Sequence, residues 1–287
     1  MVWRARIGYY IRTYGLGTVG ALAAVGVLFH EKSKETNVAY SSKREWGYSH
    51  IPSVKWDYNW DRREPEYLVK PAKHDNNKDA DTTATDLKAK TSKATRHLLL
   101  IRHGQYNMES SDDLGRFLTK LGQEQADITG RRLKDLNLPY TILISSTMTR
   151  AKETADIIHK HVPQLSIVRN DLLREGAPIP PEPPSAHWRP EEAQFYKEGA
   201  RVEAAFRKYF HRADPDQTED SYEIIVCHAN VIRYFVCRAL QFPPEGWLRM
   251  SLANGSITYL VIRPSGRVHI KNLGETGHMP VDKITFT

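Results

Sequence analysis

The sequence predicts an α/β protein, a three-layer α/β/α sandwich built on a largely parallel sheet and preceded by an N-terminal membrane helix. Two observations carry this prediction. From about residue 96, short apolar runs alternate with helical patterns, an order that is typical of a parallel sheet packed between helices. Near the N-terminus, one apolar segment is long enough to cross a bilayer.

The candidate strands are short apolar runs bounded by polar residues. In chain order they are HLLLI, TILISS, LSIV, YEIIVC and SITYLVI. Two helical patterns lie between the early runs, TKLGQEQADITGRRLKDL and TRAKETADIIHKHV. They begin at Thr119 and Thr149, and threonine is a favourable N-cap, so we expect these two residues to cap the helices.

The first 30 residues have the character of a mitochondrial targeting segment and transmembrane anchor. They contain arginines but no acidic residue, and residues 13–29 are 17 consecutive uncharged residues. About 17–25 residues span a bilayer, and Arg12 at the edge of the segment can reach the headgroups. A secretory signal peptide and a buried helix of a soluble domain are the alternatives, but no small-residue cleavage site follows Phe29. We therefore expect a membrane anchor.

Residues 31–95 have the polar composition of a solvated linker. Within them, the stretch WGYSHIPSVKWDYNWD gathers Trp46, Tyr48, Trp56, Tyr58 and Trp60. A disordered tether has no reason to expose so much apolar area, so this stretch should dock on a protein surface. It docks either on its own domain or on a neighbouring subunit, where Asp57 and Asp61 would add polar contacts. The residues alone do not decide between these two.

The charge and cysteine content exclude several classes of protein. The 287 residues carry 41 Lys and Arg against 34 Asp and Glu, a net charge of +7. This balance suits an anionic partner, but the basic residues are scattered and no helix-turn-helix or zinc-finger spacing occurs, so we expect no nucleic-acid partner. Cys227 and Cys237 form no CxxC, which argues against a disulfide framework or a cysteine-based metal site.

Polar residues suited to phosphate chemistry follow the predicted strands. Arg102 and His103 follow the first run, His228 follows YEIIVC, and Arg150 lies at the start of the helix after TILISS. In parallel sheets, ligands bind beyond the carboxyl ends of the strands. An arginine fork matches phosphate oxygens, and a neutral imidazole can attack phosphorus. These residues therefore favour a pocket for a phosphoryl group.

Five segments make this interpretation specific. They are LIRHGQ, LTKLGQEQA, ISSTMTRAKETA, LREGAPI and VCHANVIR. Their order is that of the histidine phosphatase, or phosphoglycerate mutase-like, superfamily, which the chain resembles over roughly residues 96–275. The resemblance implies the phosphoglycerate mutase-like sandwich, with residues 96–287 as a histidine phosphatase catalytic domain.

The resemblance also implies a role for each motif residue. His103 would be the nucleophile that becomes a phosphohistidine. Arg102 and Arg150 would hold the non-bridging oxygens, and His228 would complete the phosphate pocket. Glu175 would protonate the leaving oxygen and later activate water. This mechanism needs no metal or other cofactor.

Two departures from the family's mutases point to hydrolysis. Mutases carry an asparagine about six residues after the nucleophile, where Glu109 stands here, and a longer loop that grips phosphoglycerate. Here the loop EGAPIPPEPPSAHW is short and rich in proline, so it should be stiff and leave the pocket open. Ala229 replaces the usual glycine after the second histidine, a change we expect to be tolerated. We expect little or no phosphoglycerate mutase activity.

Together with the apolar N-terminus, the WDYNWD stretch resembles the mitochondrial protein-phosphatase branch of the family. That branch implies a serine/threonine phosphatase, in a single-pass protein of the outer rather than the inner mitochondrial membrane. The implied substrates are phosphoserine and phosphothreonine proteins, a stress-signalling protein kinase among them. The implied assembly is a homo-oligomer built through Trp56, Asp57, Asn59, Trp60 and Asp61.

Two other classes of function are alternatives to the phosphatase. A metal-dependent hydrolase would need histidine ligands, but the one close pair, His159 and His161, is better interpreted as a solvated helix end. An oligomeric scaffold with weak phosphatase activity is the other alternative, although every expected catalytic residue is present. Cys227 should face away from His228 into packing, which argues against a thiol nucleophile. Trp188 is either a substrate contact or a hydrophobic plug.

Overall fold

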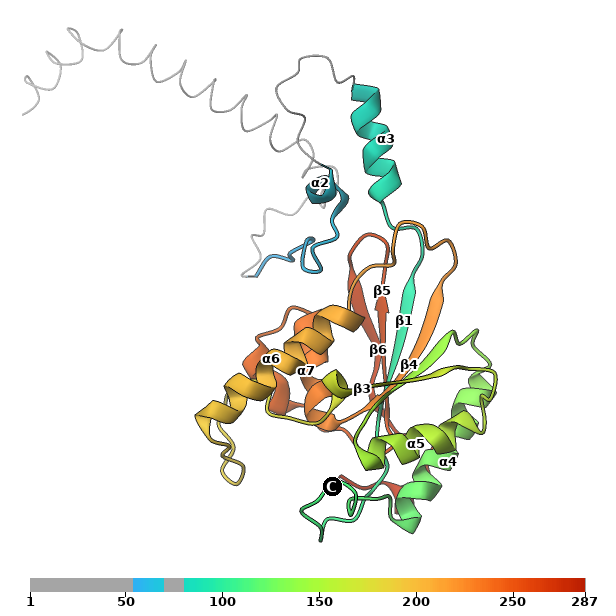
Figure 1. Ribbon diagram of the computed structural model, residues 1–287, viewed down its shortest axis with the longest axis vertical. Helices are drawn as coiled ribbons and strands as arrows, with labels where there is room; N and C mark the ends of the chain where they lie inside the picture. Colours follow the sequence, from blue (N-terminus) through green and yellow to red (C-terminus); the bar gives the residue numbers. More distant parts are fainter. Residues whose placement is uncertain (1–53, 70–79, 287) are drawn as a thin grey trace, which may run out of the picture. The chain divides into compact units, whose positions relative to one another are not determined.

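The computed structural model describes residues 54–69 and 80–286. Within them, a six-stranded sheet has the order β3-β2-β4-β1-β5-β6 (Figure 1). Its strands are β1 (Arg96–Arg102), β2 (Ile142–Ser146), β3 (Ile167–Asn170), β4 (Ser221–Cys227), β5 (Ile257–Ile262) and β6 (Val268–Glu275). The first four are parallel to one another, and β5 and β6 continue the sheet as antiparallel strands. The prediction of a largely parallel sheet is confirmed.

Strand β1 explains how one sheet supports two cores. Every residue of β1 is buried, which is expected for a central strand with both faces covered. Leu98 and Leu100 belong to one apolar core, whereas Leu99 and Ile101 belong to another. Since side chains alternate along a strand, the two cores lie on opposite faces of the sheet.

Two pairs of helices cover these faces. Helices α6 (Glu192–Tyr209) and α7 (Ala229–Ala239) contribute to the core of Leu98, and α5 (Thr149–His159) and α4 (Lys120–Leu136) contribute to the core of Leu99. Figure 1 shows α6 and α7 on one side of the sheet and α4 and α5 on the other. The predicted three-layer sandwich is therefore confirmed. The predicted membrane helix lies outside the described residues.

The two predicted caps differ in outcome. Thr119 caps α4 as predicted, since its side chain accepts a hydrogen bond from the Gly122 N–H. The prediction for Thr149 is wrong, because the N-cap of α5 is Met148 and Thr149 is the first helical residue. The Thr149 hydroxyl donates instead to Asp113, at 3.4 Å. It binds the loop ahead of α4 rather than its own helix.

The linker prediction needs one correction. Residues 80–90 form helix α3 (Ala80–Lys90), and a short helix α2 (Pro65–Leu68) lies earlier in the chain. The sequence of α3 contains good helix formers and ends with two lysines, which favour the carboxyl end of a helix. Most side chains of residues 84–90 are exposed, so this part of the linker is solvated but helical.

Residues 56–287 form one compact unit, and the other unit comprises residues 1–55. The proposed division of function at residues 30 and 95 stays a prediction. Among the described residues, no helix is long and apolar enough to cross a membrane. The apolar segment at residues 13–29 lies outside them.

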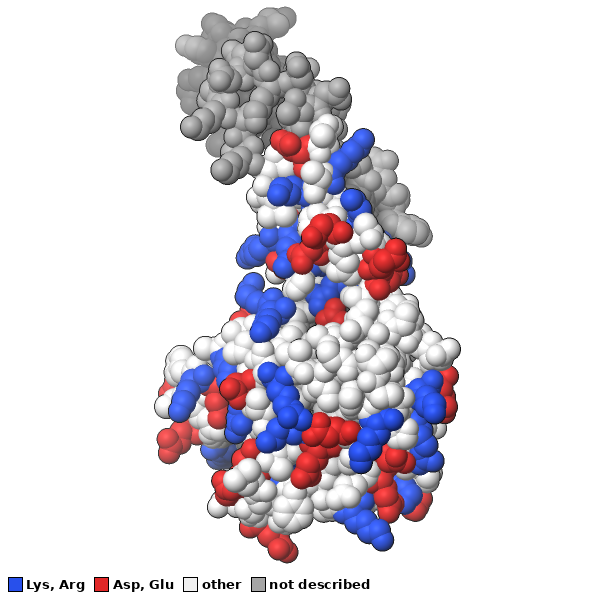
Figure 2. All heavy atoms as spheres, turned by 45° about the vertical axis from the view of Figure 1, so that its right-hand side comes forward, with Lys and Arg blue, Asp and Glu red and all other residues white. Residues whose placement is uncertain are grey.

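The surface charge is mixed. On the face drawn in Figure 2, lysines and arginines lie among aspartates and glutamates, with a broad uncharged area between them. The net charge of +7 is therefore not gathered into a basic patch on this face. That agrees with the scattered basic residues of the sequence.

Candidate active site

His103 and His228 lie beyond the carboxyl ends of two neighbouring parallel strands. Arg102 of β1 is in register with Cys227 of β4, and the next residues along are the two histidines. The His103 N–H donates to the Cys227 carbonyl at 3.0 Å. The two imidazole centroids are 5.1 Å apart. The strands thus bring together the histidines that the sequence places 125 positions apart.

Hydrogen bonds fix the ring of His103 in one tautomer. Arg150 donates from Nε to Nε2 of His103 at 3.1 Å, and Nδ1 of the ring lies 2.8 Å from the Gly104 carbonyl. An arginine can only donate, so Nε2 carries the lone pair and Nδ1 carries the proton. Burial and the two cations Arg150 and Arg102 lower the pKa of His103 well below its ordinary value. His103 is therefore a neutral imidazole with a directed lone pair on Nε2.

Several polar donors around His103 converge without protein partners. Within the described residues, Nε of Arg102, Nη1 of Arg150 and Nδ1 of His228 are buried and have no hydrogen-bond partner. Leaving a buried donor unpaired costs roughly 1–3 kcal/mol, and more for a charged group. Nη1 of Arg102 is tied to the Leu252 carbonyl at 2.6 Å, which holds the guanidinium in place. Such a group of donors is suited to an anion with several oxygens.

His228 is oriented from the adjacent strand. Its Nε2 lies 2.8 Å from the hydroxyl oxygen of Ser146, the last residue of β2. The ring is fully buried, and burial together with His103 and Arg150 lowers its pKa well below the ordinary value. His228 is thus a neutral hydrogen-bonding group in this site rather than a permanent cation.

Glu175 lies in the loop after the short helix η1 (Asp171–Leu173). Burial raises the pKa of its carboxyl, and the cations Arg150 and Arg102 oppose that rise. The Gly176 N–H donates to Oε1 of Glu175 at 3.2 Å. The structure therefore places this carboxyl within the electrostatic reach of both arginines, as a group that gains a proton more readily than an exposed glutamate.

Four residues of the site were missed by the sequence analysis. Tyr106 packs edge-on against His103 with centroids 5.2 Å apart, and the guanidinium of Arg150 lies 4.7 Å from the centre of its ring. The Thr154 hydroxyl accepts from the Gly104 N–H at 3.0 Å. Asn254 donates to the His103 carbonyl at 3.2 Å.

The fourth missed residue is Arg233, one turn into α7. Its Nε is buried without a partner in the described part of the chain, and Glu175 opposes the lowering of its pKa by burial. Arg233 is the last residue of the motif VCHANVIR. Its position one helical turn after Ala229 is a sequence pattern from which its place at the site could have been predicted.

Glycines allow the loop that follows His103 to lie directly on α4. A Cβ on Gly104 would collide with the carbonyl oxygen of Gly122, and a Cβ on Gly122 would collide with the carbonyl oxygen of Gln105. The segments RHGQ and LGQEQ are therefore packed backbone to backbone. Gln125 adds a side-chain contact, because its Oε1 accepts from the Gln105 N–H at 2.8 Å.

The side chains of the other residues singled out in the sequence serve packing or lie at the surface. Cys227 is fully buried in an apolar core, as predicted, and burial raises the pKa of its thiol. Trp188 packs edge-on against Trp247, with centroids 5.6 Å apart, as part of an aromatic cluster. Glu109 is exposed, and Ala229 is buried as the first residue of α7.

The histidine pair is not grouped as a metal site. His159 bonds the Leu165 carbonyl, whereas His161 pairs with Asp127 at 2.7 Å. Over residues 54–69 and 80–286, no three His, Cys, Asp or Glu side chains are grouped so that they could hold a metal ion.

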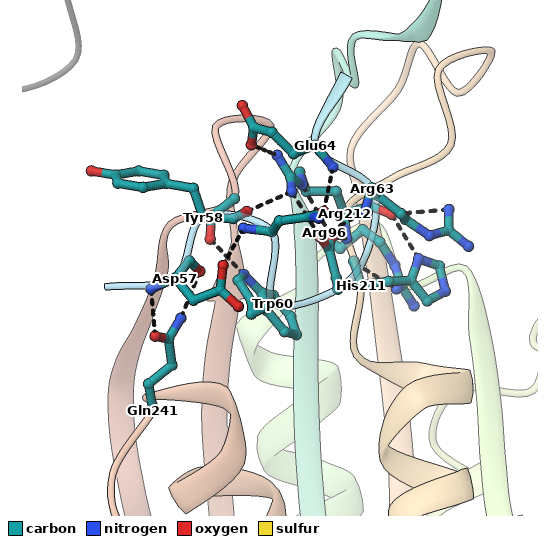
Figure 3. Close-up of polar contacts among 12 residues, drawn as sticks. Asp57, Tyr58, Trp60, Arg63, Glu64, Arg96, His211, Arg212 and Gln241 are labelled. Carbon is teal, nitrogen blue, oxygen red and sulfur yellow. Dashed lines mark hydrogen bonds and ion pairs between the residues drawn. The ribbon is translucent and has the colours of Figure 1, made fainter. Parts of the chain in front are cut away.

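The WDYNWD stretch docks on the same chain (Figure 3). Trp60 is buried against Phe206, and its indole N–H donates to the Gly266 carbonyl at 2.8 Å. Asp61 pairs with Arg212 at 2.7 Å, with both side chains almost fully buried. The stretch forms a turn, in which the Asn59 N–H donates to the Asp57 carboxylate.

A larger ion-pair cluster surrounds this turn. Arg212 also donates to Glu64 at 2.6 Å and to the Tyr58 carbonyl at 2.7 Å, so its guanidinium is fully engaged. Figure 3 shows Arg212 among Tyr58, Trp60 and Glu64. The contacts within one chain match the first of the two docking alternatives. Whether a neighbouring subunit can supply the stretch stays a prediction.

The fold and this pocket are matched by a known class of phosphatase. The family model of the histidine phosphatase superfamily (branch 1) matches residues 98–178 and 180–275. The chain belongs to the histidine phosphatase superfamily, and it is an enzyme that hydrolyses phosphoric monoesters.

Named relatives agree with this assignment. The mitochondrial serine/threonine-protein phosphatase PGAM5 of Rattus norvegicus is 61% identical over 230 residues, which cover 80% of each chain. Its counterpart of the same name in Xenopus laevis is 51% identical over 279 residues, covering 97% of this chain and 100% of that one. The solved structure of Bacillus stearothermophilus YhfR is 20% identical, with a TM-score of 0.50, and covers 64% of this chain and 98% of that one. The last likeness shows the fold alone.

Proposed function

We propose that this chain is a protein serine/threonine phosphatase that works through a phosphohistidine on His103. The observation that carries the proposal is the fixed, neutral imidazole, whose Nε2 lone pair lies among buried arginine donors. A held nucleophile divides hydrolysis into two easier transfers. The same donors would stabilise the charge of the transferring phosphoryl group.

In the first transfer, Nε2 of His103 attacks phosphorus and the bond from phosphorus to the ester oxygen breaks. Glu175 gives its proton to the departing serine or threonine oxygen. The new imidazolium keeps its Nδ1–H on the Gly104 carbonyl. Arg102, Arg150 and His228 bind the three non-bridging oxygens.

In the second transfer, water attacks the phosphohistidine and gives a proton to the Glu175 carboxylate. The phosphorus–nitrogen bond breaks, inorganic phosphate leaves, and His103 regains its lone pair. Glu175 ends protonated and ready for the next ester. The raised pKa of its carboxyl supports this exchange of acid and base roles.

The preference for a protein substrate is supported by two kinds of observation. The relatives at 51–61% identity are named serine/threonine-protein phosphatases. Glu109 is exposed where the mutases have an asparagine, and Trp188 is held in an aromatic cluster rather than left to grip a small acid. We infer little or no phosphoglycerate mutase activity, and a stress-signalling protein kinase as one phosphoprotein substrate.

The cellular setting is also a proposal. The relatives are named mitochondrial, and residues 13–29 have the length of a membrane span. We propose a single-pass mitochondrial protein, in the outer rather than the inner membrane. Full-length protein should resist alkaline carbonate extraction from mitochondria, and release by carbonate would contradict the anchor.

Trapping the intermediate tests the mechanism. Full-length enzyme is denatured in base during turnover of a ³²P-labelled phosphothreonine peptide, and the label should remain on the protein, stable in base and labile in acid. His103→Asn should abolish both the label and turnover, whereas the matched change His159→Asn, outside the pocket, should keep both. Normal turnover by His103→Asn would overturn the proposal. Chelator should leave the rate unchanged, because no step uses a metal.

A further inference from the structure

Helix α6 holds the loop that carries Glu175. The contact is made by Arg201, whose two terminal nitrogens donate to three backbone carbonyls: Nη1 to Leu172 at 2.9 Å and to Arg174 at 2.6 Å, and Nη2 to Glu175 at 2.9 Å. Three carbonyls within four residues thus converge on one guanidinium. The planar fork of arginine is suited to this arrangement, because it presents several donors at fixed angles.

A second side chain of the same helix reinforces the contact. Glu198 lies three residues before Arg201, on the same helical face, and its Oε2 accepts from the Ala177 N–H at 2.5 Å. A Cβ on Gly176 would collide with the Arg201 guanidinium, and a Cβ on Gly199 would collide with the Pro178 carbonyl. The loop therefore lies directly against α6.

Asn230 also bonds this segment, its backbone to the Glu175 carboxyl and its side chain to the Gly176 carbonyl, but the backbone of Glu175 itself has few partners among the described residues. Its own N–H has only the thioether of Met148 as an acceptor, at 3.3 Å, and sulfur is a weak acceptor. The carbonyls that Arg201 binds lie in the short 3₁₀ helix η1 and just after it, where carbonyl groups lack helical partners. Arg201 thus supplies the charged hydrogen bond that holds the backbone of Glu175.

We propose that Arg201 is a positioning residue that holds Glu175 in reach of the leaving oxygen. The inference rests on the acid role of Glu175 in the proposed function. A general acid must lie about 2.6–3.2 Å from the oxygen that it protonates, so a small shift of this loop weakens proton transfer. Phosphoryl transfer to His103 from an ester whose leaving group needs no proton should be spared.

Leaving-group dependence separates these two effects. Full-length Arg201→Met and Arg201→Lys are assayed on p-nitrophenyl phosphate, whose leaving group needs no proton, and on a phosphothreonine peptide, whose alkoxide does. We expect the rate of enzyme phosphorylation, measured by rapid quench, to fall about 30-fold with the peptide and less than about threefold with the aryl ester. Lysine keeps the charge but not the three-way fork, so it should restore only part of the loss. The matched control Arg207→Met removes an exposed arginine of α6 that pairs with Glu203 and should leave both rates unchanged.

A double variant decides whether Arg201 acts through Glu175. Glu175→Gln with Arg201→Met should be no slower on the peptide than Glu175→Gln alone. Additive losses, or equal losses on the two esters in Arg201→Lys as well as Arg201→Met, would overturn the positioning role. If Glu175→Gln itself slows both esters equally, the acid assignment in the proposed function fails instead. Retained aryl phosphatase activity reports that each variant is folded.

Discussion

Arg150 and His103 share one hydrogen bond at the centre of the site, from Nε of the guanidinium to Nε2 of the ring at 3.1 Å. The bond points the lone pair of the imidazole at the guanidinium of Arg150. Burial and this cation lower the pKa of His103 and keep the ring neutral. In the proposed mechanism this bond must break when Nε2 attacks phosphorus, which would leave Nε of Arg150 to a phosphoryl oxygen. Arg150 would then orient the nucleophile first and bind the phosphorylated ring afterwards.

Replacing Arg150 should change the pH dependence of the enzyme as well as its rate. In Arg150→Met the cation that lowers the pKa of His103 is lost, so the acid limb of kcat/KM should move to higher pH. We also expect kcat/KM to fall by about 10²–10³, as for loss of one preorganised donor. Arg150→Lys keeps the charge and should leave the acid limb near its original place. An unchanged acid limb in Arg150→Met would show that the cation does not control the ionisation of His103.

The two buried histidines should make folding stability depend on pH. Both have a folded-state pKa well below the ordinary 6.5, so the unfolded chain takes up protons first as the pH falls. Stability is therefore present above pH 6.5 and is lost below it, down to the folded-state pKa values. In His228→Gln, the loss of unfolding free energy between pH 7.5 and 5.5 should be smaller by about 1 kcal/mol. Urea unfolding at the two pH values measures this difference.

Glu175 should produce an alkaline limb that depends on the leaving group. Burial raises the pKa of its carboxyl above the ordinary 4.5, and protonation is needed to expel an alkoxide. Turnover of a phosphothreonine peptide should therefore decline as the pH rises through this raised pKa. Phosphorylation of the enzyme by p-nitrophenyl phosphate, measured by rapid quench, should lack that limb. The limb should also vanish from the peptide profile in Glu175→Gln.

Thr154 connects the segment that follows His103 to the backbone of Arg150, and a substitution tests how much the pocket depends on this connection. Its hydroxyl accepts from the Gly104 N–H and donates to the Arg150 carbonyl at 2.7 Å, and the side chain is fully buried. Thr154→Val keeps the shape but leaves the Gly104 N–H unpaired, which should cost about 1–3 kcal/mol of unfolding free energy and lower kcat. Thr154→Ser keeps the hydroxyl and serves as the control. Equal stability of the valine and serine variants would contradict this role.

Local patterns were sufficient to predict the edge at which the site lies. The run before Arg102 and the run before His228 are buried strands, and their parallel pairing brings both histidines to one edge. The predicted strand LSIV is shifted, since β3 begins at Ile167. Strand β6 was missed because VHIKNLGE carries lysine, asparagine and glycine and lies half exposed at the edge of the sheet, where alternation is weak.

Contacts between distant segments could not be predicted in the same way. Arg201 is 26 residues from Glu175, and nothing in its sequence surroundings distinguishes it from Arg207 on the same helix. The docking site of Trp60 depends on where the turn at Gly266 lies, 206 residues away. Such contacts follow from how the helices and turns pack around the sheet rather than from local periodicity.

The buried pair of Asp61 and Arg212 permits a direct test of how the WDYNWD stretch is used. Leaving a buried charge fully unpaired costs roughly 3–5 kcal/mol, and Asp61→Asn should cost part of this because Arg212 keeps only Glu64 as its carboxylate partner. Asp61→Asn should therefore release the stretch from its docking site. Asp57→Asn is the matched control, since Asp57 is exposed and its side chain bonds only the neighbouring turn.

Sedimentation velocity then distinguishes a contact within one subunit from a contact that joins neighbouring subunits. If the docking site around Arg212 and Gly266 receives the stretch from a neighbouring subunit, repeated contacts of this kind close a ring. A chain that retains residues 50–65 should then sediment as a larger and more active species than one that begins near residue 90. Asp61→Asn, and Trp56→Ala with Trp60→Ala, should reduce it to the small form with aryl phosphatase activity intact. If all of these chains sediment alike and Asp61→Asn only lowers the unfolding temperature, the stretch makes its contacts within one subunit. Those contacts then stabilise the domain without joining copies of the chain.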